Sequence, residues 1–211
     1  MSELVTRVVS GIAMIIVALG AAVLGGYYFA LLAAAAATGM FYEWRRITRG
    51  WGLHWSVGGF FYCVLPALAL LWIRDRSGDH GLSLLLWVFI VTWATDIGAY
   101  FAGRSFGKRK LAPSISPGKT VEGLWGGVAA ATLFGAAWVL STGLGKPLVL
   151  LAPLFAVAAQ MGDLFESKMK RTAGIKDSGN WLPGHGGLLD RLDGLVPVAV
   201  LTVAAQFAGL T

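Results

Sequence analysis

Charged residues are scarce in this chain of 211 residues: they make up 13% of it, whereas hydrophobic residues make up 56%. Soluble domains carry about 25% charged residues. The chain therefore falls outside the soluble globular class, and its apolar runs of about 18 to 22 residues can cross a bilayer. A single cysteine, Cys63, excludes an intrachain disulfide framework and a cysteine-based metal site. The alternation typical of barrel strands is also missing, so spanning helices are expected.

The apolar runs predict an all-α, polytopic membrane helix bundle of about seven transmembrane helices in a single domain, residues 1–211. The first run, which follows Arg7, is also compatible with a cleavable signal peptide. Because a second apolar run follows almost at once, we interpret the two as a retained helical hairpin. The predicted helices are 5–24, 27–44, 55–73, 82–102, 121–141, 147–167 and 194–210.

The few cations are distributed unevenly between the predicted loops. With the N-terminus in the cytoplasm, fourteen Lys and Arg residues fall in cytoplasmic segments and only Arg74, Arg76 and Lys146 on the opposite side. This bias predicts a cytoplasmic N-terminus and an external C-terminus. The basic cytoplasmic segments also account for the net charge of +6, so this charge does not indicate a nucleic-acid surface. The expected partner is the lipid bilayer, and no nucleic acid is expected.

Five carboxylates, five cations and a histidine gather between positions 163 and 194. Four polar residues there are spaced so that they share one helix face: Asp163, Glu166, Ser167 and Lys170. Asp190 and Asp193 form a further pair three residues apart. Between them, the Gly-rich segment 183–187 can bring backbone amides close to a ligand. Paired carboxylates beside Lys and Arg suit the joint binding of a divalent metal and a polyphosphate.

A second polar cluster covers residues 96–123. Asp96 lies within an apolar helix and shares a face with Tyr100, so it is either a functional residue or a helix-packing hydrogen-bond partner. The segment 116–120 is not a Walker P-loop, because position 113 is proline and no strand precedes it. Ser116, Lys119 and Thr120 can still bind phosphate ahead of a helix N-terminus. Glu122 in the first helical turn is read either as a capping carboxylate or as a ligand contact.

Both clusters resemble the signature of the phosphatidate cytidylyltransferases (CDP-diacylglycerol synthases). In the later cluster the matching residues are Ser167, Lys170, Arg171, Lys176, Asp177, Pro183, His185, Gly186, Gly187, Asp190, Arg191 and Asp193. In the earlier cluster they are Asp96, Gly98, Ala99, Tyr100, Gly103, Phe106, Gly107, Lys108, Leu111, Pro113, Ser116, Pro117, Lys119, Thr120, Glu122 and Gly123. The N-terminal part looks shorter than in many members of that family.

The resemblance implies an enzyme of phospholipid biosynthesis in the cytoplasmic membrane, with its active site facing the cytoplasm. The enzyme would transfer a cytidylyl group from CTP to phosphatidic acid, giving CDP-diacylglycerol and pyrophosphate. The nucleophile is an ionised phosphate oxygen, so no general base is required, and catalysis would consist mainly of charge neutralisation. A homodimer is also implied.

Roles follow from the resemblance together with side-chain chemistry. Mg²⁺ is the expected cofactor, with room for a second cation, and its expected ligands are Asp163 and Asp190, followed by Asp193 and Glu166. The expected phosphate clamps are Lys170, Arg171, Lys176 and Arg191. Asp177 would order Lys176 or the loop, and His185 would bind phosphate, stabilise the loop or be purely structural. The expected nucleotide- and substrate-binding residues are Asp96, Tyr100, Ser116, Lys119, Thr120, Glu122, Ser167, Gly186 and Gly187.

Three other functions compete with this interpretation. A transporter would distribute ionisable residues near mid-membrane and in repeated halves, which the sequence does not do. A CDP-alcohol phosphotransferase would continue beyond Asp190–Gly194 with further spaced aspartates, which are missing here. A CTP-dependent lipid kinase of the polyprenol type shares the gross features. We expect the two polar clusters to meet in one cavity at the cytoplasmic face.

Overall fold

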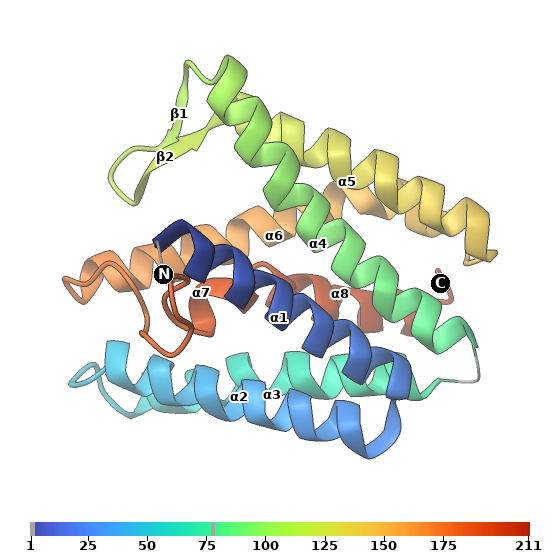
Figure 1. Ribbon diagram of the computed structural model, residues 1–211, viewed down its shortest axis with the longest axis horizontal. Coiled ribbons are helices and arrows are strands. Elements are labelled where there is room, and N and C mark those ends of the chain that lie inside the picture. Colours follow the sequence, from blue (N-terminus) through green and yellow to red (C-terminus); the bar gives the residue numbers. More distant parts are fainter. Residues whose placement is uncertain (1–2, 77–78) are drawn as a thin grey trace.

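The computed structural model describes residues 3–76 and 79–211, which form a bundle of long helices with a small hairpin at one end (Figure 1). The elements in chain order are α1 (Glu3–Leu24), α2 (Gly26–Ile47), α3 (Leu53–Asp75), α4 (Asp79–Phe106), β1 (Lys110–Ala112), β2 (Ser116–Thr120), α5 (Val121–Thr142), α6 (Pro147–Thr172), α7 (Leu189–Leu192) and α8 (Leu195–Phe207). The two ends of the chain lie at opposite ends of the bundle (Figure 1).

The membrane helix bundle expected from the sequence is confirmed. In the described ranges, five helices are long and apolar enough to cross a membrane, namely α1, α3, α4, α5 and α6. The 13-residue helix α8 is about 20 Å long at 1.5 Å per residue, short of a hydrocarbon core of about 30 Å. The count of seven spans therefore remains a prediction. Helices α4 and α6 extend beyond the predicted spans into polar residues, because a helix does not end where the apolar run ends.

The segment between α4 and α5, which the sequence indicated as a loop, contains two short strands within the otherwise helical bundle. There β1 and β2 form a two-stranded antiparallel hairpin in which Lys110 pairs with Thr120 and Ala112 with Ser116. Its turn is closed by the Ile115 N–H, which donates to the Ala112 carbonyl at 3.1 Å. The strands are too short to give a clear alternating pattern, which is why the sequence indicated only a loop.

Glycines bring α4 and α5 into close contact. A Cβ atom at Gly98 would lie 2.6 Å from the Gly126 carbonyl oxygen, and one at Gly127 would lie 2.7 Å from the Thr95 carbonyl oxygen. Such small residues let the backbones of two helices approach closely within a membrane, where the hydrophobic effect does not drive helix association. The hairpin connects α4 to α5. The contact between these two helices therefore fixes the position of the hairpin relative to the rest of the bundle.

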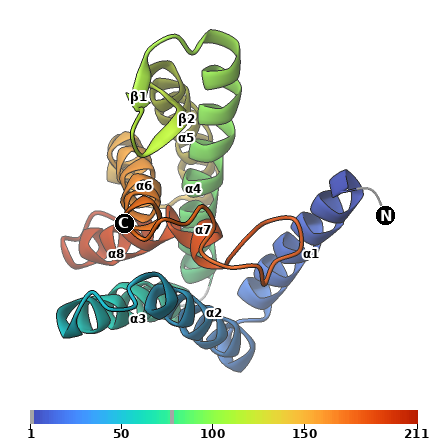
Figure 2. The same cartoon turned by 90° about the vertical axis from the view of Figure 1, so that its left-hand side faces the viewer.

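The buried side chains form two clusters. The larger one, which includes Trp87, Leu148 and Val198, draws buried residues from α1 to α6 and from α8. The smaller one, which includes Trp44 and Leu189, draws buried residues from α2, α3, α6, α7 and α8. Helix α1 contributes Ala22, near its C-terminal end, to the larger cluster. The segment 173–188 lies between α1 and the rest of the bundle (Figure 2).

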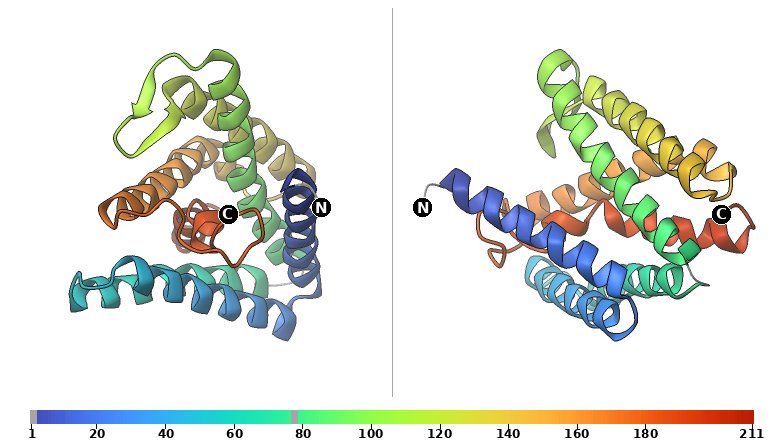
Figure 3. Two further views of the ribbon diagram at one scale, coloured as in Figure 1. Left: turned by 60° about the vertical axis from the view of Figure 1, so that its left-hand side comes forward. Right: turned by 45° about the vertical axis from the view of Figure 1, so that its right-hand side comes forward.

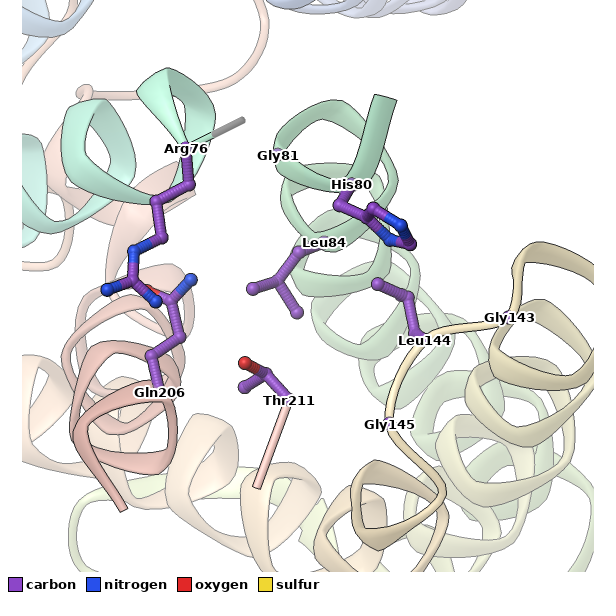
Figure 4. Close-up of a pocket in the computed structure, with 9 residues that line it drawn as sticks. All are labelled: Arg76, His80, Gly81, Leu84, Gly143, Leu144, Gly145, Gln206 and Thr211. Atoms are coloured by element: carbon purple, nitrogen blue, oxygen red, sulfur yellow. The ribbon is translucent and has the colours of Figure 1, made fainter. Parts of the chain in front are cut away.

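A cavity of about 280 Å³ opens at the end of the bundle where α3 ends and α4 begins. Its lining includes Arg76, His80 and Gln206, together with Gly143 and Gly145 from the α5–α6 connection (Figure 4). None of the residues predicted to form the site lines it. It therefore lies away from the predicted chemistry.

The glycine contact predicts an asymmetric response to added methyl groups. A Cβ at Gly126 would lie 2.9 Å from the Gly98 carbonyl oxygen, whereas one at Gly58 of α3 would meet no atom within 4 Å. We expect Gly126→Ala to lower the free energy of unfolding by about 1–3 kcal/mol through overpacking. The matched control Gly58→Ala should leave it unchanged or raise it. Thermal unfolding in detergent measures both, and an equally stable Gly126→Ala protein would contradict the close contact.

Candidate functional site

The predicted site residues gather at one end of the bundle. The C-terminal end of α6, the β1–β2 hairpin, α7 and the N-terminal end of α1 all lie there (Figure 1). The segment 173–188 leaves α6, passes between α1 and α2, and returns to α7 (Figure 3). Segments from both polar clusters of the sequence therefore share one end of the molecule.

The polar face predicted on α6 is confirmed. The Ser167 hydroxyl donates to Asp163 Oδ1 at 3.2 Å, four residues earlier on the same helix. The Lys170 ammonium lies 2.6 Å from Glu166 Oε2, again four residues earlier. The Glu166 side chain is 1% exposed, so the ammonium neutralises a carboxylate that water does not reach.

Lys170 also connects α6 to α7. Its Nζ donates to Asp190 Oδ1 at 2.5 Å, and Asp190 Oδ2 accepts from the Gly187 N–H at 2.8 Å and the Ser178 N–H at 2.9 Å. Burial alone raises the pKa of Asp190, but these hydrogen bonds from Lys170 and Gly187 outweigh burial and keep it below its ordinary value. Asp190 is thus an ionised carboxylate held in one orientation.

The two polar clusters meet at Lys119. Its ammonium lies 2.6 Å from Asp163 Oδ2 and donates to Gln160 Oε1 at 2.7 Å, so the end of β2 is joined to α6. Asp96 lies within electrostatic range of both Lys119 and Asp163. Asp96 lies within α4, as predicted, and its side chain is exposed.

Asp193 differs from the other carboxylates of the site. It is 9% exposed and accepts a hydrogen bond from the Gly194 N–H at 2.8 Å. Burial, and next the negative charge of Asp163, raise its pKa. The pKa of Asp193 is thus shifted in the opposite direction to that of Asp190.

The four carboxylates predicted as metal ligands do not form a closed cage. Across residues 3–76 and 79–211, no three acidic, histidine or cysteine side chains lie close enough to hold one ion. Mg²⁺ is commonly bound by one or two carboxylates, with water and substrate phosphates completing its shell. The partly exposed Asp163 and the ionised Asp190 fit that pattern, whereas Glu166 is enclosed with Lys170.

Two residues of the earlier cluster have local structural roles. Thr120 is the N-cap of α5, where its hydroxyl accepts from the Gly123 N–H at 3.0 Å. The Glu122 carboxylate accepts from the Lys108 and Arg109 N–H groups at 3.0 and 3.2 Å, and it pairs with the Arg109 guanidinium. Thr120 therefore caps α5, whereas Glu122 ties the segment that precedes β1 to the first turn of α5.

Arg171, Arg191 and His185 contact backbone or α1 in this structure. Arg171 Nε donates to the Ile115 carbonyl and ties the hairpin turn to α6, while Arg191 Nε donates to the His185 carbonyl. His185 Nδ1 lies 3.0 Å from the Ser10 hydroxyl of α1. The histidine thus holds the Gly-rich segment against the first helix, as its structural interpretation requires.

Several other predicted residues are exposed or half-buried. Tyr100, Lys176 and Asp177 are exposed, and Ser116 is half-buried at the start of β2. Gly186 has a φ of +83°, and a Cβ there would lie 2.8 Å from Asp190 Oδ2. Glycine is therefore required at this position by Asp190 as well as by the turn.

One site residue was missed by the sequence reasoning. Glu43, near the end of α2, is fully buried and hydrogen-bonded to the segment that carries Asp190. The signal available for it was an acidic residue in the last turns of an otherwise apolar helix, the same signal that singled out Asp96.

The chain is similar to known cytidylyltransferases over most of its length. A family model described as the cytidylyltransferase family matches residues 49–208. A phosphatidate cytidylyltransferase of Brucella suis biovar 1 is 37% identical over 251 aligned residues, which cover 95% of this chain and 92% of the relative. Because that alignment exceeds 211 positions, it includes segments of the relative with no counterpart in this chain.

Two further relatives carry the same name. A phosphatidate cytidylyltransferase of Pseudomonas aeruginosa is 41% identical over 164 residues, covering 75% of this chain and 60% of the relative. One of Bacillus subtilis is 49% identical over 125 residues, covering 57% of this chain and 46% of the relative.

The buried ion pairs predict a specific stability effect. Lys170→Met would leave Glu166 and Asp190 without their shared cation, which should cost about 3–5 kcal/mol of unfolding free energy. Adding Glu166→Gln to the Lys170→Met variant should restore part of the lost unfolding free energy. Lys168→Met, at an exposed position two residues away, is the matched control. Thermal unfolding in detergent is the measurement, and equal stability of the two lysine variants would exclude a buried cation at position 170.

Proposed function

Because this chain belongs to the cytidylyltransferase family, we propose that it transfers the cytidylyl group of CTP to phosphatidic acid, giving CDP-diacylglycerol and pyrophosphate. The observation that carries the proposal is the contact between Lys119 and Asp163 at 2.6 Å. It joins the two matching segments into one polar site at the end of a membrane bundle, where a lipid phosphate and a nucleotide can meet.

The chemistry is a displacement at the α-phosphorus of CTP. An ionised oxygen of the lipid phosphate forms the new P–O bond, and the bond to the bridging oxygen of the β-phosphate breaks, releasing pyrophosphate. The principal obstacle is repulsion between anions. Lys119 and Lys170 place two ammonium groups within one site, where they can neutralise phosphate oxygens as charge develops.

The proposal includes Mg²⁺ held by Asp163 and Asp190. When bound, the ion would neutralise and orient the triphosphate. Asp190 is suited to this role because its hydrogen bonds keep it ionised and oriented, and Asp163 because it is 31% exposed. Lys176 and Asp177, both exposed beside the site, are proposed to contact the phosphates after substrate binding. The homodimer implied by the resemblance is also proposed, and light scattering in detergent measures its mass.

Label transfer separates this function from its competitors. The purified protein in mixed micelles with phosphatidic acid is given CTP labelled at the α-phosphate. Label in the lipid supports cytidylyl transfer, label in free CDP supports a CTP-dependent kinase, and no turnover contradicts both enzymes. We expect label in the lipid.

The joint site predicts coupled mutational effects. Asp163→Asn, Asp190→Asn, Asp96→Asn and Lys119→Ala should each reduce kcat/KM by more than about a hundredfold, since each removes several kcal/mol of charge stabilisation. The double variant of Lys119→Ala with Asp190→Asn should lose much less than the product of the two single losses. Rates that simply multiply would indicate that the two segments serve separate purposes.

We propose that the site faces the cytoplasm, as the bias of Lys and Arg predicts. Gly118 at the hairpin and Lys146 between α5 and α6 are exposed and mark the two ends of the bundle. In a Cys63→Ala background in intact cells, an impermeant thiol reagent should label Lys146→Cys and spare Gly118→Cys. The reverse pattern would overturn the orientation.

A further inference from the structure

Helix α2 contributes a carboxylate, Glu43, to which the proposed transfer reaction assigns no role. Glu43 lies near the C-terminal end of this helix and its side chain is 0% exposed. It lies before residue 49, where the family match begins. A fully buried carboxylate is retained only where several donors compensate its lost hydration.

The donors to Glu43 come from both ends of one loop. Oε2 accepts from the Ser178 hydroxyl at 2.9 Å and from the Leu189 N–H at 2.8 Å, and Oε1 accepts from the Leu188 N–H at 3.1 Å. Ser178 begins the Gly-rich loop 178–189, and Leu188 and Leu189 end it. The carboxylate therefore closes this loop from the side of α2.

Two glycines of the loop leave space for the carboxylate. A Cβ at Gly179 would collide with Glu43 Oε1, and one at Gly187 would lie 2.5 Å from both Glu43 oxygens. Both glycines have φ outside the left-handed region, so backbone conformation does not require them. The close approach of the Glu43 carboxylate explains why neither position carries a side chain, and at Gly187 the Ser178 hydroxyl also takes this space.

The same loop residues hold Asp190. Asp190 Oδ2 accepts from the Ser178 and Gly187 N–H groups, while Glu43 binds the Ser178 hydroxyl and the neighbouring Leu188 N–H. The two carboxylates thus fasten the same two chain segments from opposite sides. With Oδ2 held in this way, Oδ1 is the oxygen presented to Lys170.

We propose that Glu43 is a positioning residue, which sets the orientation of Asp190 by closing the loop 178–189. This inference rests on the proposed function, in which Asp190 is a ligand of the cation. Residues that orient a metal ligand change affinity or activity by about 10- to 100-fold when altered. Glu43 would act through Asp190 without touching the substrate.

Glu43→Gln tests the proposal with little change in shape. The amide has one acceptor oxygen, so its NH₂ group must face a backbone or hydroxyl donor in the loop. Thr38→Ala is the matched control, because Thr38 lies on α2, is exposed, and its hydroxyl donates only within its own helix, to the Ala34 carbonyl. The probe is Mn²⁺, whose free concentration is followed by electron paramagnetic resonance in the absence of nucleotide.

We expect Glu43→Gln to weaken Mn²⁺ binding by at least about tenfold and to raise the Mg²⁺ concentration for half-maximal transfer by a similar factor. Amide hydrogen exchange should accelerate in residues 178–190 and remain unchanged in the hairpin, residues 110–120. Thr38→Ala should match the wild type in all three measurements. Wild-type Mn²⁺ affinity in a folded Glu43→Gln protein would overturn the proposal, as would unchanged exchange in the loop.

Ser178→Ala keeps the proposal testable where Glu43→Gln fails to fold. It removes one of the three donors to Glu43 and leaves the Ser178 N–H to Asp190 in place. We expect a smaller loss of Mn²⁺ affinity, about threefold or more, and wild-type affinity would again overturn the proposal. If the wild type binds Mn²⁺ and responds to these changes but transfers no label from CTP, the proposed function fails while the positioning role stands.

Discussion

The structure depends on the cost of placing carboxylates inside a membrane protein. Glu166, Asp190 and Glu43 are buried or nearly so, and each is compensated by an ammonium group or by several N–H and O–H donors. Because an uncompensated buried charge is expensive, these contacts admit few arrangements of α2, α6 and α7. The same network that permits burial also orients the groups proposed to bind metal and phosphate.

The helix contacts serve this network. Close packing of α4 against α5 through Gly98 and Gly126 fixes the hairpin that follows α4, and the hairpin carries Lys119 to Asp163. Arg171 fastens the hairpin turn to the end of α6 by donating to the Ile115 carbonyl. The bundle therefore acts as a rigid support for a polar site at one end, which is how a membrane enzyme can bring a lipid phosphate and a nucleotide together.

Much of this arrangement could be predicted from the sequence. Apolar run length gave the long helices, and the spacing of Asp163, Glu166 and Lys170 gave the polar face of α6, because both signals are local. The hairpin was not predicted, since its strands have three and five residues. Glu43 was missed because its partners lie 135 to 146 residues away, a distance at which no pattern in a single sequence reports contact.

We propose that the two polar segments bind one nucleotide jointly with one cation. The most direct measurement is a crystal structure with CTP and Mn²⁺, in which anomalous scattering locates the ion. We expect an anomalous peak that contacts Asp163 and Asp190, with the triphosphate within hydrogen-bond distance of the Lys119 ammonium. A nucleotide bound in the cavity lined by Arg76 and His80, or an ion contacting neither aspartate, would contradict it.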